Sequence, residues 1–91
     1  MAALYFDVEA DAALTRLEHD DTQPKLQAAV NRVLDQLEND PGDRTVRKNR
    51  FTIGLWAVSA HGENESWLIL WEPHPTDSDG VMVHYLGPSF S

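Results

Sequence analysis

The hydrophobic pattern of this sequence changes from a helical period to a strand period at residues 39–43. Before this point apolar side chains recur every three or four residues, as they do on one face of an α-helix. Beyond it, apolar residues alternate with a period of two in residues 51–60, as they do in a β-strand. The segment between them, Asn39-Asp40-Pro41-Gly42-Asp43, stops a helix because proline cannot continue one and disfavours it in the preceding residue. The pattern predicts helices followed by a sheet.

The first half of the chain is predicted to form a strand and two helices. Residues 4–8 are a short apolar and aromatic run that suits a strand. A helical stripe follows and ends at residues 19–22; it consists of Ala10, Ala13, Leu14 and Leu17. The second helix begins at Pro24, with Thr22 or Gln23 as its cap. Its apolar stripe is Leu26, Ala29, Val30, Val33, Leu34 and Leu37.

The second half is predicted to form a three-stranded meander. In residues 51–60 the alternation changes phase across Gly54, which predicts a β-bulge within one strand. Residues 61–65 form a polar hairpin loop. The strand predicted at residues 66–71 is apolar on both faces, which is typical of a central strand covered on both sides. The last strand is expected at residues 81–86.

The predicted fold class is α+β, with the order β-α-α-β-β-β and a helical hairpin packed on a mostly antiparallel four-stranded sheet. Residues 1–91 are expected to form one domain, since 91 residues and a 42% hydrophobic composition suit a single core. The absence of cysteine excludes disulfides and thiol nucleophiles. No apolar run reaches the roughly 18–20 residues of a membrane span, which predicts a cytoplasmic protein without membrane contact.

Positive charge is concentrated in one short segment. The formal net charge is -8, from 15 acidic and 7 basic side chains, and this argues against a general nucleic-acid-coating protein. Four of the basic residues lie within residues 44–50, and we predict that they bind substrate phosphate. They are Arg44, Arg47, Lys48 and Arg50. The alternative is a solvated loop whose charges balance nearby carboxylates.

His84 and Tyr85 are the best catalytic candidates by residue type. Histidine has an unperturbed pKa of about 6.5, which suits proton transfer at neutral pH. We expect His84 on the open side of the sheet with Met82 and Leu86. The residues expected to face the helices are Val81, Val83 and Tyr85. The alternative for His84 is a histidine on the sheet surface without a catalytic role.

No metal site and no cofactor are predicted. His61 and His74 lie in predicted turns with glutamates nearby in sequence, but neither surrounding segment has the ligand spacing of a metal motif on a regular element. His19 ends the first predicted helix, where a cation is favourable.

The three tryptophans, Trp56, Trp67 and Trp71, are predicted to lie in the core or to form a partner interface. By spacing, Trp67 and Trp71 share one strand face with Ile69. If the helices cover only one face of the sheet, the other apolar face is an expected docking site for a partner chain.

The sequence resembles the RelE/ParE superfamily of bacterial toxins from type II toxin–antitoxin systems. The resemblance is carried by AALTRLEHDDTQPKLQAAVNRVLDQLENDPGD, followed by LWAVSA, WLILWE and VMVHYLG, in that order and spacing. It implies the α+β fold described above and growth inhibition through mRNA cleavage or inhibition of DNA gyrase. It also implies neutralisation by a cognate antitoxin protein.

For a family member that cuts mRNA on the ribosome, the resemblance implies an endoribonuclease (mRNA interferase). In this chain Arg47 and Arg50 would then hold phosphate and His84 would transfer protons. The arginines that such members carry on the sheet are replaced here; the positions are Ala57, Ser59 and Leu68. The alternative function is a non-catalytic interaction or regulatory module, including a homodimer that associates through the tryptophan-bearing sheet.

Overall fold

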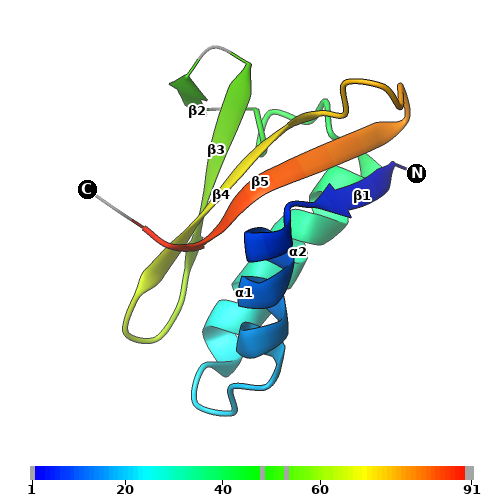
Figure 1. Ribbon diagram of the computed structural model, residues 1–91. Helices are drawn as coiled ribbons and strands as arrows, with labels where there is room; N and C mark the ends of the chain where they lie inside the picture. The colour runs from blue at the N-terminus through cyan, green and yellow to red at the C-terminus, as the bar shows by residue number, and fades with distance from the viewer. Residues whose placement is uncertain (1, 48, 53, 90–91) are drawn as a thin grey trace.

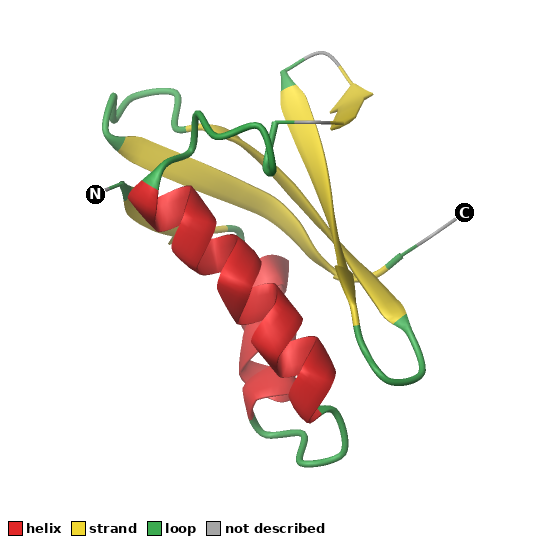
Figure 2. Cartoon of the chain, turned by 180° about the vertical axis from the view of Figure 1, so that it is seen from behind, coloured by secondary structure: helices red, strands yellow, loops and turns green. Residues whose placement is uncertain are grey.

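The computed structural model describes residues 2–47, 49–52 and 54–89, which form a helical layer on one face of a β-sheet. The helices are α1 (Val8–Glu18) and α2 (Pro24–Asn39). The strands are β1 (Ala3–Phe6), β2 (Asn49–Thr52), β3 (Leu55–His61), β4 (Ser66–Pro73) and β5 (Gly80–Pro88). Figures 1 and 2 show both helices on the same side of the sheet, so no described element covers the other side, which we call the open face.

The five strands are arranged in the order β1-β5-β4-β3-β2. β1 runs parallel to β5, from Ala3 opposite Gly80 to Phe6 opposite Val83, and the other three pairings are antiparallel. The predicted α+β class with a helical hairpin against a mostly antiparallel sheet is therefore confirmed. The predicted number of strands was wrong, because the described sheet has five strands and not four.

The additional strand comes from the segment around Gly54. Gly54 has a φ of 87°, in the left-handed region that glycine occupies at little steric cost. The chain reverses there, since Thr52 pairs with Leu55 across the turn. The change of phase across Gly54 thus marks the turn of a hairpin and not the predicted bulge within one strand, while the pairing of β2 with β3 shifts its register between Arg50 and Thr52. Ile53, part of the predicted alternation, lies outside the described residues.

Helix α1 begins and packs as its sequence predicts. The side chain of Asp7, at the N-cap, accepts a hydrogen bond from the Glu9 backbone N–H at 3.2 Å, which satisfies one of the free donors of the first turn. Ala10, Ala13 and Leu17 are buried, and the helix packs mainly against β5.

Helix α2 is capped by a distant loop. Pro24 is its first residue, and the neighbouring Gln23 makes no capping bond with its side chain. Instead, the Glu63 carboxylate accepts hydrogen bonds from the backbone N–H groups of Lys25 (2.9 Å) and Leu26 (3.2 Å). These bonds, above all the one from Lys25, lower the pKa of Glu63. The hairpin loop after β3 therefore fixes where α2 begins.

The hairpin loop that caps α2 also packs closely against the first turn of this helix. A Cβ added to Gly62 would lie 2.5 Å from the Leu26 Cβ and 3.0 Å from its Cα, so only glycine lets the loop approach the helix this closely. Leu26, together with Val30 and Leu37, is completely buried against the sheet. The loop and the first turn of α2 consequently behave as one packed unit.

The hydrophobic core lies between the helices and the face of the sheet that they cover. Its largest fully buried strand residues are Ile69, Trp71, Val81, Val83 and Leu86. The segment after α2 also contributes, because Val46 is only 1% exposed. In the described part of the chain, neither helix has the length and apolar character needed to cross a membrane.

Candidate functional site

A β-bulge in β5 sets the orientation of the predicted catalytic residues. Leu70 of β4 pairs with Tyr85, but the next residue, Trp71, pairs with Val83, so His84 has no direct partner on β4. A bulge of this kind changes the phase of the side chains that follow it.

The change of phase corrects one prediction. Val81 and Val83 face the helices as expected, but Leu86 is 2% exposed within the core instead of lying on the open face. Tyr85 pairs with Leu70 and lies outside the core cluster, but its side chain lines a cleft beside α1 together with Ala13. The alternation in the sequence cannot reveal a bulge whose position depends on the pairing with β4.

His84 lies beside Glu72 on the open face. The imidazole Nε2 is 3.3 Å from the Glu72 Oε1, and the two side chains are 38% and 28% exposed. The Nε2 atom is itself buried without a hydrogen-bond partner among the described residues. The pair is therefore close but poorly aligned, and it becomes an ion pair only when His84 is protonated. A neighbouring carboxylate of this kind can orient an imidazole and balance its charge during proton transfer.

Tyr85 is held by its own strand. Its hydroxyl donates a hydrogen bond to the Pro88 carbonyl at 2.7 Å. The ring also lies over Gly87, where an added Cβ would be 3.0 Å from the Tyr85 hydroxyl oxygen. A catalytic role for Tyr85 would require its hydroxyl to leave the Pro88 carbonyl.

Two of the predicted substrate-binding arginines lie on the side of the sheet opposite His84. Arg50 of β2 pairs with Trp56, and its Cζ is 4.4 Å from the centroid of the Trp56 ring. The Arg47 Cζ is 5.8 Å from Trp56 and 5.5 Å from Trp71, while its Nε donates to the Pro41 carbonyl at 2.7 Å. Trp56 packs against the core, so these guanidiniums lie on the helix side of the sheet.

The other two basic residues add little to this group. Arg44 is exposed, and neither ring contacts nor hydrogen bonds of its side chain are found in the described residues. Lys48 lies outside the described residues. The structure therefore brings Arg47 and Arg50 to the same tryptophan, but it places them on a different face of the sheet from His84.

The tryptophans are mostly core residues. Trp71 is 0% exposed and its indole N–H donates to the Val46 carbonyl at 3.0 Å. Trp67 is 7% exposed and donates to the Glu65 carboxylate, also at 3.0 Å. Trp56 is partly buried and is the one that the arginines cover. A partner interface that includes these three residues stays a prediction.

Sequence reasoning missed the role of His74 and Tyr5. The His74 Nδ1 lies 3.2 Å from the Thr76 backbone nitrogen and 3.1 Å from that of Asp77, so it accepts from both N–H groups. The Tyr5 ring lies 4.2 Å from the His74 ring, and its hydroxyl donates to Asp77 at 2.6 Å. This hydrogen bond raises the pKa of Tyr5 and lowers that of Asp77. No local pattern links β1 to residues 74–77, so this contact could not be predicted.

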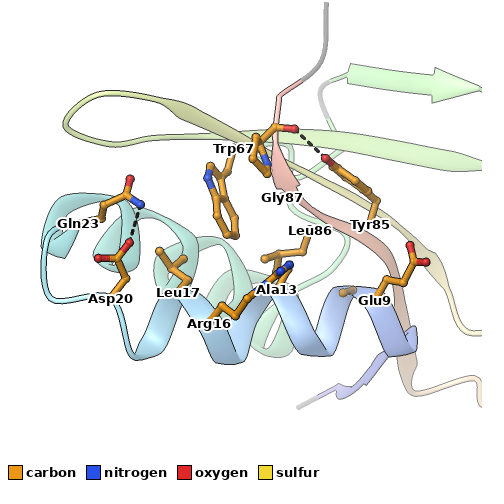
Figure 3. A pocket seen from close by; sticks show the side chains of 12 residues that line it. Glu9, Ala13, Arg16, Leu17, Asp20, Gln23, Trp67, Tyr85, Leu86 and Gly87 are labelled. Carbon is orange, nitrogen blue, oxygen red and sulfur yellow. Dashed lines mark hydrogen bonds between the residues drawn. The ribbon is translucent and has the colours of Figure 1, made fainter.

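The structure also contains a cleft that the sequence did not indicate. It has a volume of about 400 Å³ and lies between α1 and the part of β5 beyond the end of β1. Figure 3 shows Ala13, Leu17 and Trp67 among its lining residues, with Arg16 and Asp20 also present. Among the described residues, no three histidine, aspartate or glutamate side chains converge as metal ligands.

Comparison with known protein families, characterised proteins and solved structures finds no significant match to this chain. A functional interpretation therefore depends on the geometry of its side chains and on the resemblance in sequence described above.

Proposed function

We propose that this chain is the toxin-like component of a bacterial type II toxin–antitoxin pair, which acts in the cytoplasm and is neutralised by a small antitoxin protein. The observation that carries the proposal is the open face of the sheet, where a bulge holds His84 beside Glu72 while the helices cover the opposite face. A helical hairpin against one face of a mostly antiparallel sheet is also the arrangement that the RelE/ParE resemblance implies. Because one fold hosts many functions, the polar group on the open face matters more than the fold.

Cleavage of mRNA is the first candidate for its action. Attack by a 2′-hydroxyl group needs a base, an acid for the leaving oxygen, and a cation near the phosphate. His84 can transfer the proton, and Glu72 can hold its imidazole and balance the charge that forms. The chain would then act as an endoribonuclease on ribosome-bound mRNA.

The cation is the missing part of such a site. Arg47 and Arg50 lie on the other side of the sheet, and no arginine pairs with Glu72 among the described residues. We infer that basic groups of the ribosome or metal ions bound to it supply this charge. Inhibition of DNA gyrase, which requires no such catalytic set, is the alternative action for the same toxin-like chain.

A non-catalytic interaction module is the second candidate function. It is favoured by the apolar side chains beside His84 on the open face, where Leu68 and Met82 are only partly buried. A partner protein or a second copy of this chain would cover them. In this case His84 would contribute to recognition and not to proton transfer.

Inducible expression of the chain alone in a bacterium tests the proposal. We expect growth arrest that is relieved when the small protein encoded by an adjacent gene is produced together with it. His84→Gln should relieve the arrest if mRNA cleavage is its cause, while His61→Gln, the same change in an exposed hairpin residue, should not. Unchanged growth with the folded protein present at high level would exclude a toxin and favour the interaction module.

A further inference from the structure

Arg47 and Arg50 form a cationic site that the proposed function does not use. Both guanidiniums approach the same indole ring, that of Trp56, with Cζ-to-centroid distances of 5.8 and 4.4 Å. A ring face stabilises a nearby cation, which explains how two like charges can be held in one place. The ring also orders both side chains before any ligand arrives, which lowers the entropic cost of binding.

In the part of the chain that the structure describes, the charge of these two arginines is not balanced by a carboxylate. Neither forms an ion pair among the described residues. The acidic side chains nearest in sequence are engaged in their own loop, because Asp43 accepts hydrogen bonds from the Thr45 backbone N–H (2.8 Å) and hydroxyl (2.7 Å), which lower its pKa. Asp40 accepts from the Gly42 backbone N–H at 3.1 Å. The positive charge of Arg47 and Arg50 is therefore available to an anion from outside.

The geometry favours phosphate over carboxylate. The Arg50 guanidinium, 4.4 Å from the ring centroid, can present its N–H edge to phosphate or carboxylate oxygens in pairs, while Arg47 donates its Nε–H to the Pro41 carbonyl and keeps its Nη groups for a ligand. Two guanidiniums beside one indole offer two positive charges, which a phosphate group with its larger negative charge and additional oxygens matches better than one carboxylate. A ligand with two adjacent phosphates offers one anionic group for each arginine.

The charge of the whole chain favours a small ligand. With a net charge of -8, the rest of the molecule repels an extended polyanion such as a long RNA. β2 lies at the outer edge of the sheet, away from α1, so a small ligand can approach Arg50 without moving a helix (Figure 1). We propose that Arg47, Arg50 and Trp56 form a binding site for a small ligand that carries phosphate groups, with a diphosphate as its minimal form.

Titration of the full chain with pyrophosphate and with ADP tests this site. Calorimetry measures the affinity, and NMR monitors the signals of the Trp56 indole N–H and the arginine Nε–H groups. We expect both ligands to bind and to shift those signals. Arg50→Gln should weaken binding by about 10-fold or more, since it removes charge-assisted hydrogen bonds. Arg50→Lys should also weaken it, because lysine keeps the charge but lacks the planar, stacked donor edge.

Arg44→Gln is the matched control, since it removes the same charge from an exposed residue outside the Trp56 group. It should change affinity much less than Arg50→Gln. An equal effect of both changes, or unaltered binding by Arg50→Lys, would show a diffuse electrostatic patch and overturn the proposal. The proposal would also be overturned if neither pyrophosphate nor ADP binds at millimolar concentration. Tighter binding of an acidic peptide, or of an RNA oligonucleotide without terminal phosphates, than of these two ligands would overturn it as well. Growth inhibition does not enter this test, so its outcome is independent of the toxin-like function.

Discussion

Neighbouring residues on β4 have opposite surroundings. Trp71 is 0% exposed, and its indole N–H is bonded to the Val46 carbonyl beneath the helices. Glu72, the next residue, lies on the open face with 28% of its side chain exposed and a histidine 3.3 Å away. The difference indicates that one face of this sheet maintains the fold while the other presents polar groups to the surroundings. Substitutions on the two faces test that division, and changes in the loops test how the helices and β1 are held against the sheet.

The largest effect on stability is expected when a buried side chain on the helix-covered face of the sheet is shortened. Trp71→Ala should lower the free energy of unfolding by about 3–5 kcal/mol, because it leaves a large cavity and an unpaired Val46 carbonyl. Leu68→Ala, on the open face of the same strand, should cost only about 1 kcal/mol, since Leu68 is partly exposed. Urea denaturation of both variants measures the contrast, and equal losses would contradict the division between the faces.

The next effect concerns the loop that caps α2. Gly62→Ala should destabilise the protein by about 1–3 kcal/mol, since the new methyl group overlaps Leu26 and its backbone must move. Gly42→Ala serves as the control, because the nearest atom to an added Cβ there, on Asp40, is 3.4 Å away. Thermal unfolding distinguishes them, and a Gly62→Ala protein as stable as Gly42→Ala would mean that the loop does not pack on α2 as described.

A smaller and pH-dependent effect is expected from Glu63→Gln. The hydrogen bonds to Glu63 lower its pKa in the folded state, so its contribution to stability is complete above about pH 4.5, its ordinary value, and is lost as the pH falls through the folded-state pKa. Removal of the charge should destabilise the protein at pH 7 and reduce the further loss of stability below pH 4.5. Chemical denaturation at a series of pH values measures this; parallel curves for both proteins would show that the cap is not formed.

The last prediction concerns the tautomer of His74 and requires no mutation. Since the His74 Nδ1 accepts from two backbone N–H groups, the neutral ring must carry its proton on Nε2. Nitrogen-15 NMR of the four histidines identifies this tautomer directly. A proton on Nδ1 of His74 would rule out the turn described for residues 74–77.

The local parts of the fold were predictable from the sequence, and the pairings between distant parts were not. Pro24 and the apolar stripe that follows it locate α2 because a helix depends on nearby residues. The turn at Gly54 was interpreted as a bulge, since both change the phase of an alternating pattern in the same way. The real bulge at His84 has no such signal, because its position depends on which residues of β4 and β5 pair.

The candidate site, too, was predictable only in part: its residue types could be identified, but not their neighbours on other strands. His84 was identified by its chemistry and lies on the open face as predicted, but its partner Glu72 comes from another strand. Arg47 and Arg50 were identified by charge, while their approach to Trp56 depends on the β2–β3 hairpin and on the loop after α2. A sequence shows which side chains are available, but the strand pairings decide which of them share a face.

Mapping of mRNA ends in cells that express the chain tests most directly whether the open face is the functional one. The predicted result is cleavage by the unaltered chain and by His61→Gln, with loss of cleavage in His84→Gln and a marked reduction in Glu72→Gln, while all four proteins unfold at similar temperatures. Cleavage that persists in His84→Gln would contradict the assignment of proton transfer to this face of the sheet.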